Sequence, residues 1–329
     1  MAIQVISTIG GGSGQYELLR SLVNFPDLSL RAIVTMADDG GSSGELRTQL
    51  GVLPAGDLRQ CLVALASESE SELIKLMNFR FTDGSYSGDN IGNLIFAACE
   101  KLWGLEESLR FLGKLFQIRG EIIPVTFQDV TLIARMTTGQ IIRGEDKIGS
   151  ADLHRLEQIY LEPKNALVNP RAIDSINESE AVIVGPGDLH TSILPNLLVS
   201  GVCEALKQTK AKLVYVCNLM TKAGQTDGLS VGGFTTYLEN YIGRDFDTIV
   251  FNGVLPPLEL SEHYRQEGES PVVIDNNLDQ RFVGVDLISK EAAASVEGDS
   301  LKRSLLRHDR QALAAAIKEV INGPDFDCV

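Results

Sequence analysis

Two adjacent carboxylates, Asp38 and Asp39, follow an apolar segment that runs from Leu30 to Ala37. The segment lacks polar alternation, as expected of a parallel strand that is covered on both faces. At the end of such a strand, the pair can hold Mg²⁺ beside a diphosphate, accept hydrogen bonds from ribose hydroxyls, or act as a general base. A solvated Asp-Gly turn is the simpler alternative. We therefore take both as candidate metal ligands and, if the protein is a transferase, as candidate catalytic residues.

A glycine-rich turn lies earlier, between the apolar run 3–9 and a helical pattern of leucines. Glycine tolerates positive φ and lets backbone amides approach a phosphate, and a helix N-terminus attracts anions. The candidate ligand-binding residues of this turn are Gly10, Gly11, Gly12, Ser13 and Gly14. Gln15 stands where a dinucleotide fingerprint has its third glycine, and no Gly-Lys-Ser/Thr follows, which disfavours both an NAD-dependent oxidoreductase and a P-loop. A purely structural tight turn is the alternative.

The residues after the acidic pair are small, and Gly40, Gly41, Ser42 and Ser43 are further candidates for ligand contacts. With Gly44 they match the Gly-x-Ser-x-Gly pattern of a hydrolase nucleophile elbow. Such an elbow needs a direct turn from strand to helix, whereas two aspartates and a glycine separate Ser42 from the predicted strand. We interpret the segment as a glycine-serine loop, which disfavours a hydrolase.

Three later segments place polar residues where predicted strands end or helices begin. Segment 88–93 supplies Asn90 and Asn93, either as amides that contact a ligand or with Asp89 or Asn90 as a helix N-cap. The other candidates are Gly185, Pro186, Gly187, Thr191 and Ser192 after strand 181–184, and Asn218 and Thr221 after strand 213–217. Because parallel strands present their carboxyl ends at one edge of a sheet, we expect a shared cleft there, with segment 185–192 as a second phosphate cradle.

The order of predicted elements is typical of an α/β protein. Strands at 3–9, 30–37, 181–184, 213–217 and 248–251 alternate with helices near 70–79, 90–102, 105–117 and 312–321, and Asp57 is expected to cap a further helix. Short strands and a hairpin turn at Thr138-Gly139 occupy the segment from about 120 to 165. We predict a Rossmann-like, doubly wound, mostly parallel sheet with a small β-rich insertion, in a single nucleotide-binding domain spanning residues 1–329.

The composition disfavours several classes of partner. A net charge of -15 argues against nucleic acid and anionic membrane surfaces, which are bound through clustered Lys and Arg. No segment approaches the roughly 18 apolar residues of a membrane helix, so we expect a cytoplasmic protein without membrane insertion. The 5 cysteines lack Cys-x-x-Cys spacing and indicate neither a disulfide framework nor a zinc site.

These motifs resemble the YvcK-type gluconeogenesis factors, relatives of the CofD-type 2-phospho-L-lactate transferases, over nearly the whole chain. The resemblance rests on the glycine turn and on segments 37–44, 53–66, 88–93, 185–197 and 215–221. Segment 53–66 adds Asp57 and Arg59 to the candidate binding residues. Near the C-terminus, Arg307-His308-Asp309 matches a recurrent family pattern, in which Arg307 can pair with a diphosphate and Asp309 can cap the last helix.

The resemblance implies a Rossmann-like fold that binds a nucleotide diphosphate, with UDP-sugars such as UDP-N-acetylglucosamine as the expected ligands. It further implies a regulatory protein of carbon metabolism, cell-wall synthesis and cell shape, and it brings no firmly assigned reaction. The alternative is a Mg²⁺-dependent, 2-phospho-L-lactate transferase-like enzyme with a guanosine diphosphate-linked donor. Asp188 and His190 stand where the branch commonly has Ser and Tyr, which leaves the base and sugar preference open. The expected partner is a small-molecule nucleotide, and the sequence is compatible with a homodimer.

Overall fold

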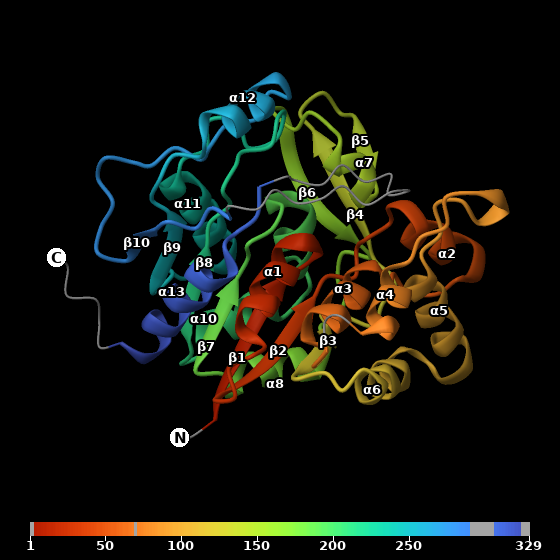
Figure 1. Ribbon diagram of the computed structural model, residues 1–329. Helices are drawn as coiled ribbons and strands as arrows, with labels where there is room; N and C mark the ends of the chain where they lie inside the picture. Colours follow the sequence, from red (N-terminus) through yellow and green to blue (C-terminus); the bar gives the residue numbers. More distant parts are fainter. Residues whose placement is uncertain (1–2, 69–70, 290–305, 324–329) are drawn as a thin grey trace.

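The computed structural model describes residues 3–68, 71–289 and 306–323. Its centre is a seven-stranded sheet of order β10-β9-β8-β7-β1-β2-β3, in which every neighbouring pair is parallel (Figure 1). The strands are β1 (Gln4–Gly10), β2 (Leu28–Val34), β3 (Glu121–Pro124), β7 (Ala181–Val184), β8 (Lys212–Val216), β9 (Thr248–Asn252) and β10 (Phe282–Val285). The predicted doubly wound α/β fold is confirmed.

Helices cover both faces of this sheet (Figure 1). One face carries α1 (Gly12–Leu22), α3 (Gly56–Leu65) and α13 (Arg310–Asn322), and the other carries α8 (Pro170–Glu178), α10 (Val202–Gln208) and α11 (Val231–Ile242). The remaining α-helices of the main body are α2 (Gly41–Leu50), α4 (Glu72–Asn78), α5 (Ile91–Trp103), α6 (Leu105–Leu115), α9 (Leu194–Leu197) and α12 (Leu258–Gln266). Burial on both faces explains why the strands show no polar alternation.

The strand order reverses between β1 and β7. From β1 the chain moves outward through β2 to β3, and from β7 it moves the other way through β8 and β9 to β10. The turns at the carboxyl ends of β1 and β7 therefore lead away from each other, which opens a crevice at that point of the sheet. Beside it the two turns pack backbone against backbone, because a Cβ on Gly14 would lie 2.3 Å from the carbonyl oxygen of Pro186.

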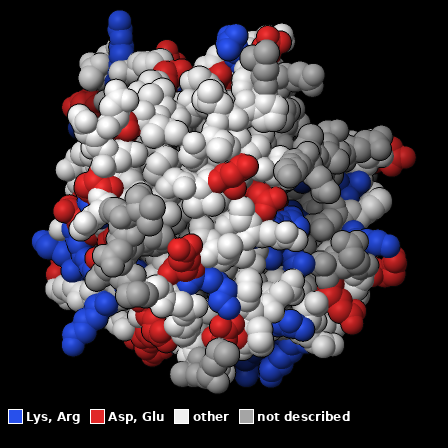
Figure 2. Space-filling view, turned by 60° about the vertical axis from the view of Figure 1, so that its left-hand side comes forward, with Lys and Arg blue, Asp and Glu red and all other residues white. Residues whose placement is uncertain are grey.

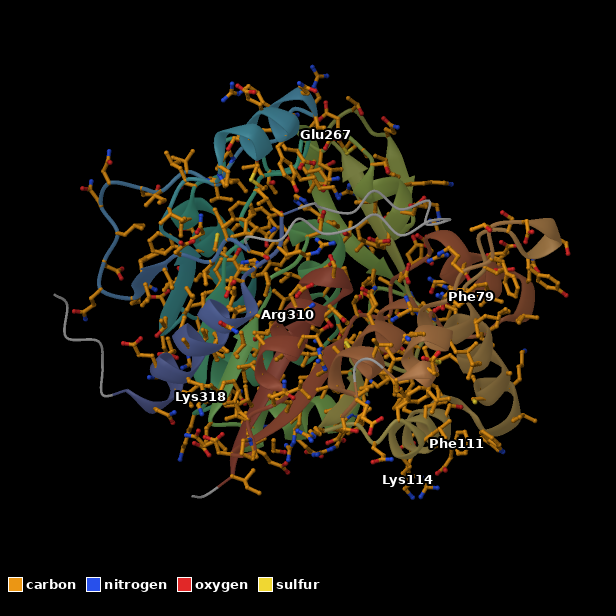
Figure 3. The ribbon with its side chains drawn as sticks, viewed as in Figure 1. Phe79, Phe111, Lys114, Glu267, Arg310 and Lys318 are labelled. Atoms are coloured by element: carbon orange, nitrogen blue, oxygen red, sulfur yellow. The ribbon has the colours of Figure 1, made fainter. Side chains whose placement is uncertain are left out.

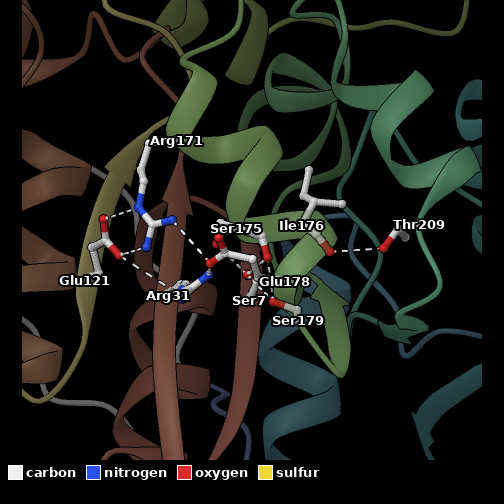
Figure 4. Close-up of polar contacts among 9 residues, drawn as sticks. All are labelled: Ser7, Arg31, Glu121, Arg171, Ser175, Ile176, Glu178, Ser179 and Thr209. Carbon is white, nitrogen blue, oxygen red and sulfur yellow. Dashed lines mark hydrogen bonds and ion pairs between the residues drawn. The ribbon is translucent and has the colours of Figure 1, made fainter.

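Buried polar contacts hold the central strand in place (Figure 4). The Ser7 hydroxyl on β1 lies 2.6 Å from that of Ser175 and 2.7 Å from that of Ser179, both contributed by α8 and the residue after it. These serine contacts satisfy hydroxyls that the packing of α8 against the sheet would otherwise leave without partners. Nearer the solvent, the partly exposed Arg171 guanidinium donates to both carboxylate oxygens of Glu121 on the edge strand β3, at 2.8 and 2.6 Å.

Gln15 replaces the third fingerprint glycine with a structural side chain. It is buried, and its amide nitrogen donates to the Thr8 hydroxyl at 3.1 Å and to the Ile33 carbonyl at 3.0 Å. The side chain thus braces the start of α1 against β1 and β2. Glutamine in place of the third glycine is therefore explained by the two hydrogen bonds that its side chain makes.

The β-rich insertion is a separate three-stranded antiparallel sheet of order β5-β4-β6. It contains β4 (Thr131–Met136), β5 (Ile141–Arg143) and β6 (Leu156–Glu162), with the short helix α7 (Glu145–Gly149) between β5 and β6. The predicted turn is confirmed, with Gly139 at a φ of 85°. The predicted start near residue 120 is wrong, because Glu121–Pro124 is the edge strand of the main sheet. A short apolar run alone does not tell a parallel edge strand from a strand of a small meander.

The predicted strand 30–37 and the predicted glycine-serine loop are also corrected. The strand ends at Val34, and the chain is helical from Gly41 onward. A Cβ on Gly44 would lie 1.9 Å from the Asp39 carbonyl oxygen, so the small residues allow a tightly packed first helical turn. Residues 35–40 separate β2 from α2, which confirms that Ser42 is not at a nucleophile elbow.

Asp57 is not the N-cap of its helix. The helix α3 begins one residue earlier, at Gly56, with Ala55 as the capping residue and no side-chain capping bond. Asp57 lies in the first turn, where a carboxylate still interacts favourably with the helix dipole. The predicted apolar positions, including Leu58 and Leu62, are buried as expected.

Acidic and basic side chains are interspersed on the surface drawn in Figure 2. On the face drawn in Figure 2, the described Lys and Arg side chains lie among Asp and Glu side chains and leave a broad uncharged area between them. Within the described residues, no helix combines the length and the apolar character needed to cross a bilayer.

We predict that Gly14→Ala destabilises the protein by about 1–3 kcal/mol, because the new methyl group overlaps backbone atoms that cannot rotate away. Urea unfolding measures the change. Gly113→Ala is the matched control, since its Cβ would meet only the flexible end of Ile118, at 3.1 Å. Equal stability of the two variants would show that the turns after β1 and β7 tolerate separation.

Candidate functional site

A cavity of about 850 Å³ opens at the carboxyl edge of the sheet, where the strand order reverses. The predicted residues that line it are Gly11, Gly12, Ser13, Gly14, Asp38, Gly40, Gly41, Ser42, Ser43, Asp57, Arg59, Asn93, Pro186, Gly187, Thr191, Ser192, Asn218, Thr221 and Arg307. The predicted residues that do not line it are Gly10, Asp39, Asn90 and Gly185. The structure therefore brings most of the dispersed motifs to one cleft, as expected of loops at this edge.

The glycine turn forms the wall of the cavity at the N-terminus of α1. Gly12 has a φ of 61°, which favours glycine, and a Cβ on Gly11 would lie 2.5 Å from an Asp57 carboxylate oxygen. Among the residues that the structure describes, no side chain caps this helix. The amides of its first turn are therefore the groups that a helix N-terminus offers to an anion.

The turn after β7 differs from the expected second cradle. Asp188 caps the short turn η2 (Leu189–Ile193), and one of its carboxylate oxygens accepts from the amides of His190 and Thr191 at 3.0 and 3.1 Å. A side-chain carboxylate thus occupies the place predicted for a phosphate. Lys222 forms an ion pair with the same Asp188. Burial raises the pKa of Asp188, but the Lys222 ammonium and the hydrogen bonds outweigh it, and the net pKa is lowered.

The two adjacent aspartates point into different hollows. Asp38 lines the main cavity, and its carboxylate accepts from the Gly40 amide at 3.0 Å. Asp39 lines a smaller hollow of about 440 Å³, where its carboxylate accepts from the Asp146 amide at 2.9 Å. The structure therefore does not bring the predicted pair together, and only Asp38 faces the cavity. In the part of the chain that the structure describes, no three His, Cys, Asp or Glu side chains are arranged to hold a metal ion.

Glu145 is a cavity residue that sequence reasoning missed. It comes from α7 of the insertion, where Gly144 enters the helix with a φ of 102°. Burial raises the pKa of Glu145 well above its usual range, and the negative charge of Asp38 raises it further, against a hydrogen bond from Thr191. Burial also raises the pKa of Asp38. No local motif marks Glu145, because only the folding of the insertion over the sheet brings it to the cleft.

Side-chain and backbone contacts tie the insertion to the loop after β8, among them an ion pair between His154 and Asp227 at 3.3 Å. The Gln225 amide nitrogen donates to the carbonyl oxygens of Ile148 and Gly149, both at 2.9 Å. The backbone amide of Leu153 in turn donates to the Gly224 carbonyl at 2.6 Å. Through these contacts, the position of α7 depends on a loop that also lines the cavity.

Asn90 and Asn93 have different roles. Asn90 is the N-cap of α5 and accepts from the Asn93 amide at 3.0 Å, which confirms the capping alternative. The Asn93 side chain accepts from the Arg59 guanidinium at 3.0 Å, and Asn78 accepts from the same guanidinium at 2.7 Å. Asn93 thus holds Arg59, a buried cation, in the wall of the cavity.

The opposite end of the cavity lies beside β8 and α13. Asn218 accepts from the Gly187 amide at 3.2 Å, which joins the loops after β7 and β8. His308 is buried against the Cys217 carbonyl oxygen, at 3.3 Å, and burial lowers its pKa to about 4. Asp309 caps α13 as predicted, and Arg307 lies 3.9 Å from Glu17 on α1.

Sequence comparisons identify the family of the chain. The sequence model described as "2-phospho-L-lactate transferase CofD" matches residues 6–292. The chain belongs to the CofD family. Within it, the chain is 38% identical over 316 residues to the "Putative gluconeogenesis factor" of Thermotoga maritima, which covers 96% of this chain and 98% of that protein. It is 36% identical over 317 residues to the "Gluconeogenesis factor" of Halalkalibacterium halodurans, with 95% of each chain covered.

The CofD-family fold is confirmed by a solved structure. The crystal structure of a UPF0052-family protein from Bacillus halodurans superposes with a TM-score of 0.87 at 33% identity, and the match covers 97% of this chain and all of that one. The chain is thus a CofD-family protein of the gluconeogenesis-factor type, as the motifs indicated.

We predict that Glu145→Gln raises the melting temperature at pH 8. Because the folded-state pKa of Glu145 lies above its ordinary value of 4.5, the ionised carboxylate costs stability as the pH rises through that window. The advantage of the glutamine variant should shrink as the pH falls toward 4.5. Glu180→Gln, at an exposed position, is the control for the change from glutamate to glutamine itself. A pH-independent difference for Glu145→Gln would contradict the raised pKa.

Proposed function

We propose that this CofD-family protein binds a UDP-sugar of the UDP-N-acetylglucosamine type in the main cavity. In this proposal, the protein acts as a regulator of carbon metabolism, cell-wall synthesis and cell shape. The observation that carries the proposal is the uncapped N-terminus of α1, which meets the cavity at the point where the strand order reverses. A volume of about 850 Å³ also lies in the range of small-molecule sites.

The diphosphate would lie against the first turn of α1. The Ser13 hydroxyl and the hydroxyls of Thr191 and Ser192 line the same part of the cavity and can donate to phosphate oxygens. Asn218 and Thr221 line the end toward β8, where they would contact base or sugar, with Arg307 beside the diphosphate. In the neighbouring turn, the Asp188 carboxylate already accepts from two backbone amides. The turn at the start of α1 would therefore be the main backbone cradle for the diphosphate.

The charge of the cavity favours a cation with the ligand. Carboxylates of Asp38, Asp57 and Glu145 line it, and a diphosphate beside them adds further negative charge. Mg²⁺ commonly binds through one or two carboxylates plus phosphate oxygens, so the residues present fit this ion with Asp38 as the protein ligand. Bound there, the ion would neutralise the diphosphate. Asp39 does not take part, because its carboxylate faces the smaller hollow.

A second candidate function is transfer of a phosphorus-containing group from a guanosine diphosphate-linked donor. It is favoured by the name of the matching family and by the place of Asp38 in the cavity. In that case Asp38 would accept the proton of an acceptor hydroxyl. The two functions differ in the base they require and in whether the bound nucleotide is consumed.

A thermal-shift panel of UDP-N-acetylglucosamine, GDP, NAD and ATP, each with and without Mg²⁺, tests both proposals. A bound ligand at about 100 times its dissociation constant stabilises the protein by about 2.7 kcal/mol. We expect this shift with the UDP-sugar. Stabilisation by GDP with Mg²⁺ alone would favour the transferase, and no response to any nucleotide would contradict both functions.

We predict that Asp38→Asn removes the Mg²⁺-dependent part of nucleotide affinity, measured by isothermal titration calorimetry, while Asp39→Asn retains it. Each asparagine keeps an oxygen for the backbone amide that its aspartate binds, so both variants should fold. The adjacent position is therefore a matched control. If both variants lose the Mg²⁺-dependent affinity equally, or if neither variant loses it, Asp38 is not the metal ligand.

A further inference from the structure

One wall of the main cavity carries an ion pair between two of the residues that line it, Asp188 and Lys222. Asp188 lies in the turn after β7, and Lys222 lies in the loop after β8. The Asp188 side chain is 20% exposed and the Lys222 side chain is 37% exposed. The pair therefore belongs to the surface that a ligand in the cavity meets, rather than to the interior of the fold.

The Asp188 carboxylate takes up the hydrogen-bond donors of this wall. One of its oxygens accepts from the backbone amides of His190 and Thr191, at 3.0 and 3.1 Å, and the other accepts from the Lys222 ammonium. The ammonium and the hydrogen bonds lower the pKa of Asp188, so the carboxylate is ionised near neutral pH. A side chain of the protein thus supplies the anion that these three donors would otherwise offer to a ligand.

This ion pair lies next to the turn at the start of α1, where the diphosphate is proposed to bind. A Cβ on Gly14 would lie 2.3 Å from the Pro186 carbonyl oxygen, and a Cβ on Gly12 would lie 3.6 Å from the Ser192 hydroxyl oxygen. Residues on both sides of Asp188 in the sequence therefore border the α1 turn. A group attached to the diphosphate on this side meets a fixed negative charge, and the nearby cation is already paired.

The other charges of the cavity add to this effect. Among the residues that the structure describes, eight acidic and four basic side chains line it. One of the acidic residues, Glu267, follows α12 above the carboxyl edge of the sheet (Figure 3). A terminal phosphate carries about 1.5 to 2 negative charges at pH 7, whereas a sugar esterified to a diphosphate carries none. The cavity is therefore better matched to an uncharged group beyond the diphosphate.

We infer that Asp188 selects the class of ligand that the cavity accepts. It admits a nucleoside diphosphate whose terminal phosphate is esterified to an uncharged, hydroxyl-bearing group, and it disfavours a nucleoside triphosphate. The oxygen that binds Lys222 has a second lone pair, which can accept from a hydroxyl of such a group. The inference rests on the function proposed for the cleft, and it names Asp188 as the specificity determinant of that site.

Asp188→Asn tests this inference. Asparagine keeps a side-chain oxygen for the two backbone amides, but it removes the negative charge and releases Lys222. Isothermal titration calorimetry at one fixed Mg²⁺ concentration gives the dissociation constants of UDP-N-acetylglucosamine and UTP. The unaltered protein should bind the UDP-sugar more tightly than UTP. In the variant, the affinity for UTP should rise about tenfold relative to the affinity for the UDP-sugar, because a like-charge contact is removed.

Two further variants separate this effect from a general change of charge. Asp174→Asn removes one negative charge at an exposed position of α8, on the face of the sheet opposite to α1, and should leave the ratio of the two dissociation constants unchanged. The double variant Asp188→Asn/Lys222→Met should lose the gain in UTP affinity, since the released ammonium is the cation that a third phosphate would contact. Thermal melting shows whether each variant is folded.

The outcomes distinguish this inference from the proposed function. Equal affinity of the unaltered protein for UTP and the UDP-sugar would overturn the inference, and so would a gain for UTP that persists without Lys222. If the unaltered protein binds the UDP-sugar but the Asp188→Asn ratio does not change, the inference alone is wrong. If the unaltered protein binds neither nucleotide, the proposed function is wrong as well.

Discussion

The close approach of Gly14 to Pro186 is the constraint on which the site depends. It brings the turn after β1 against the turn after β7 with no side chain between them. The Asn196 amide nitrogen adds a bond to the Gly10 carbonyl, at 3.0 Å, and Asn218 continues the contact to the loop after β8. Loops that are distant in sequence are thereby held at fixed spacing, and a preorganised cradle of this kind binds a ligand with little loss of conformational entropy.

The electrostatics of the cleft follow from the same packing. An acidic chain can bind an anion only where backbone dipoles or local cations offset its own carboxylates. Here the N-terminus of α1, Arg59 and Lys222 line the same cavity as Asp38 and Glu145, so charges of both signs line it. Burial raises the pKa of both carboxyls, and the negative charge of a neighbouring carboxylate, Asp39 for Asp38 and Asp38 for Glu145, raises it further.

Sequence patterns predicted the fold well because buried parallel strands are apolar throughout and end at one edge. They located the cleft because its loops follow those strands directly. They failed where contacts between segments decide whether a residue is helical or which cavity its side chain faces. The first turn of α2 has the composition of a loop, and its helix depends on the contact of Gly44 with Asp39. The opposite directions of Asp38 and Asp39 depend on the insertion, whose Asp146 amide binds Asp39.

Glu145 shows the same limit of sequence analysis, because it is a cavity residue that no motif marks. It lies in a segment with no motif and reaches the cavity only because the insertion folds back over the carboxyl edge of the sheet. Asp146, Gly149 and Ser150 line the cavity with it, whereas Ile148 is buried within the protein. No sequence motif marks any of them. A residue whose role comes from an inserted element has to be found in three dimensions.

The bonds of Gln225 to the backbone of α7 have a thermodynamic consequence. The β-rich insertion, a small lobe, supplies the Glu145 carboxylate to the cavity and is bonded to a loop of the same cavity. The free energy of moving this lobe is therefore linked to the free energy of binding a ligand in the cavity. Any molecule that displaces the lobe changes the affinity of the cleft by some factor, and ligand binding must change the affinity for that molecule by the same factor. For the nucleotide proposed above, the insertion is the element whose position would be linked thermodynamically to occupancy of the cleft.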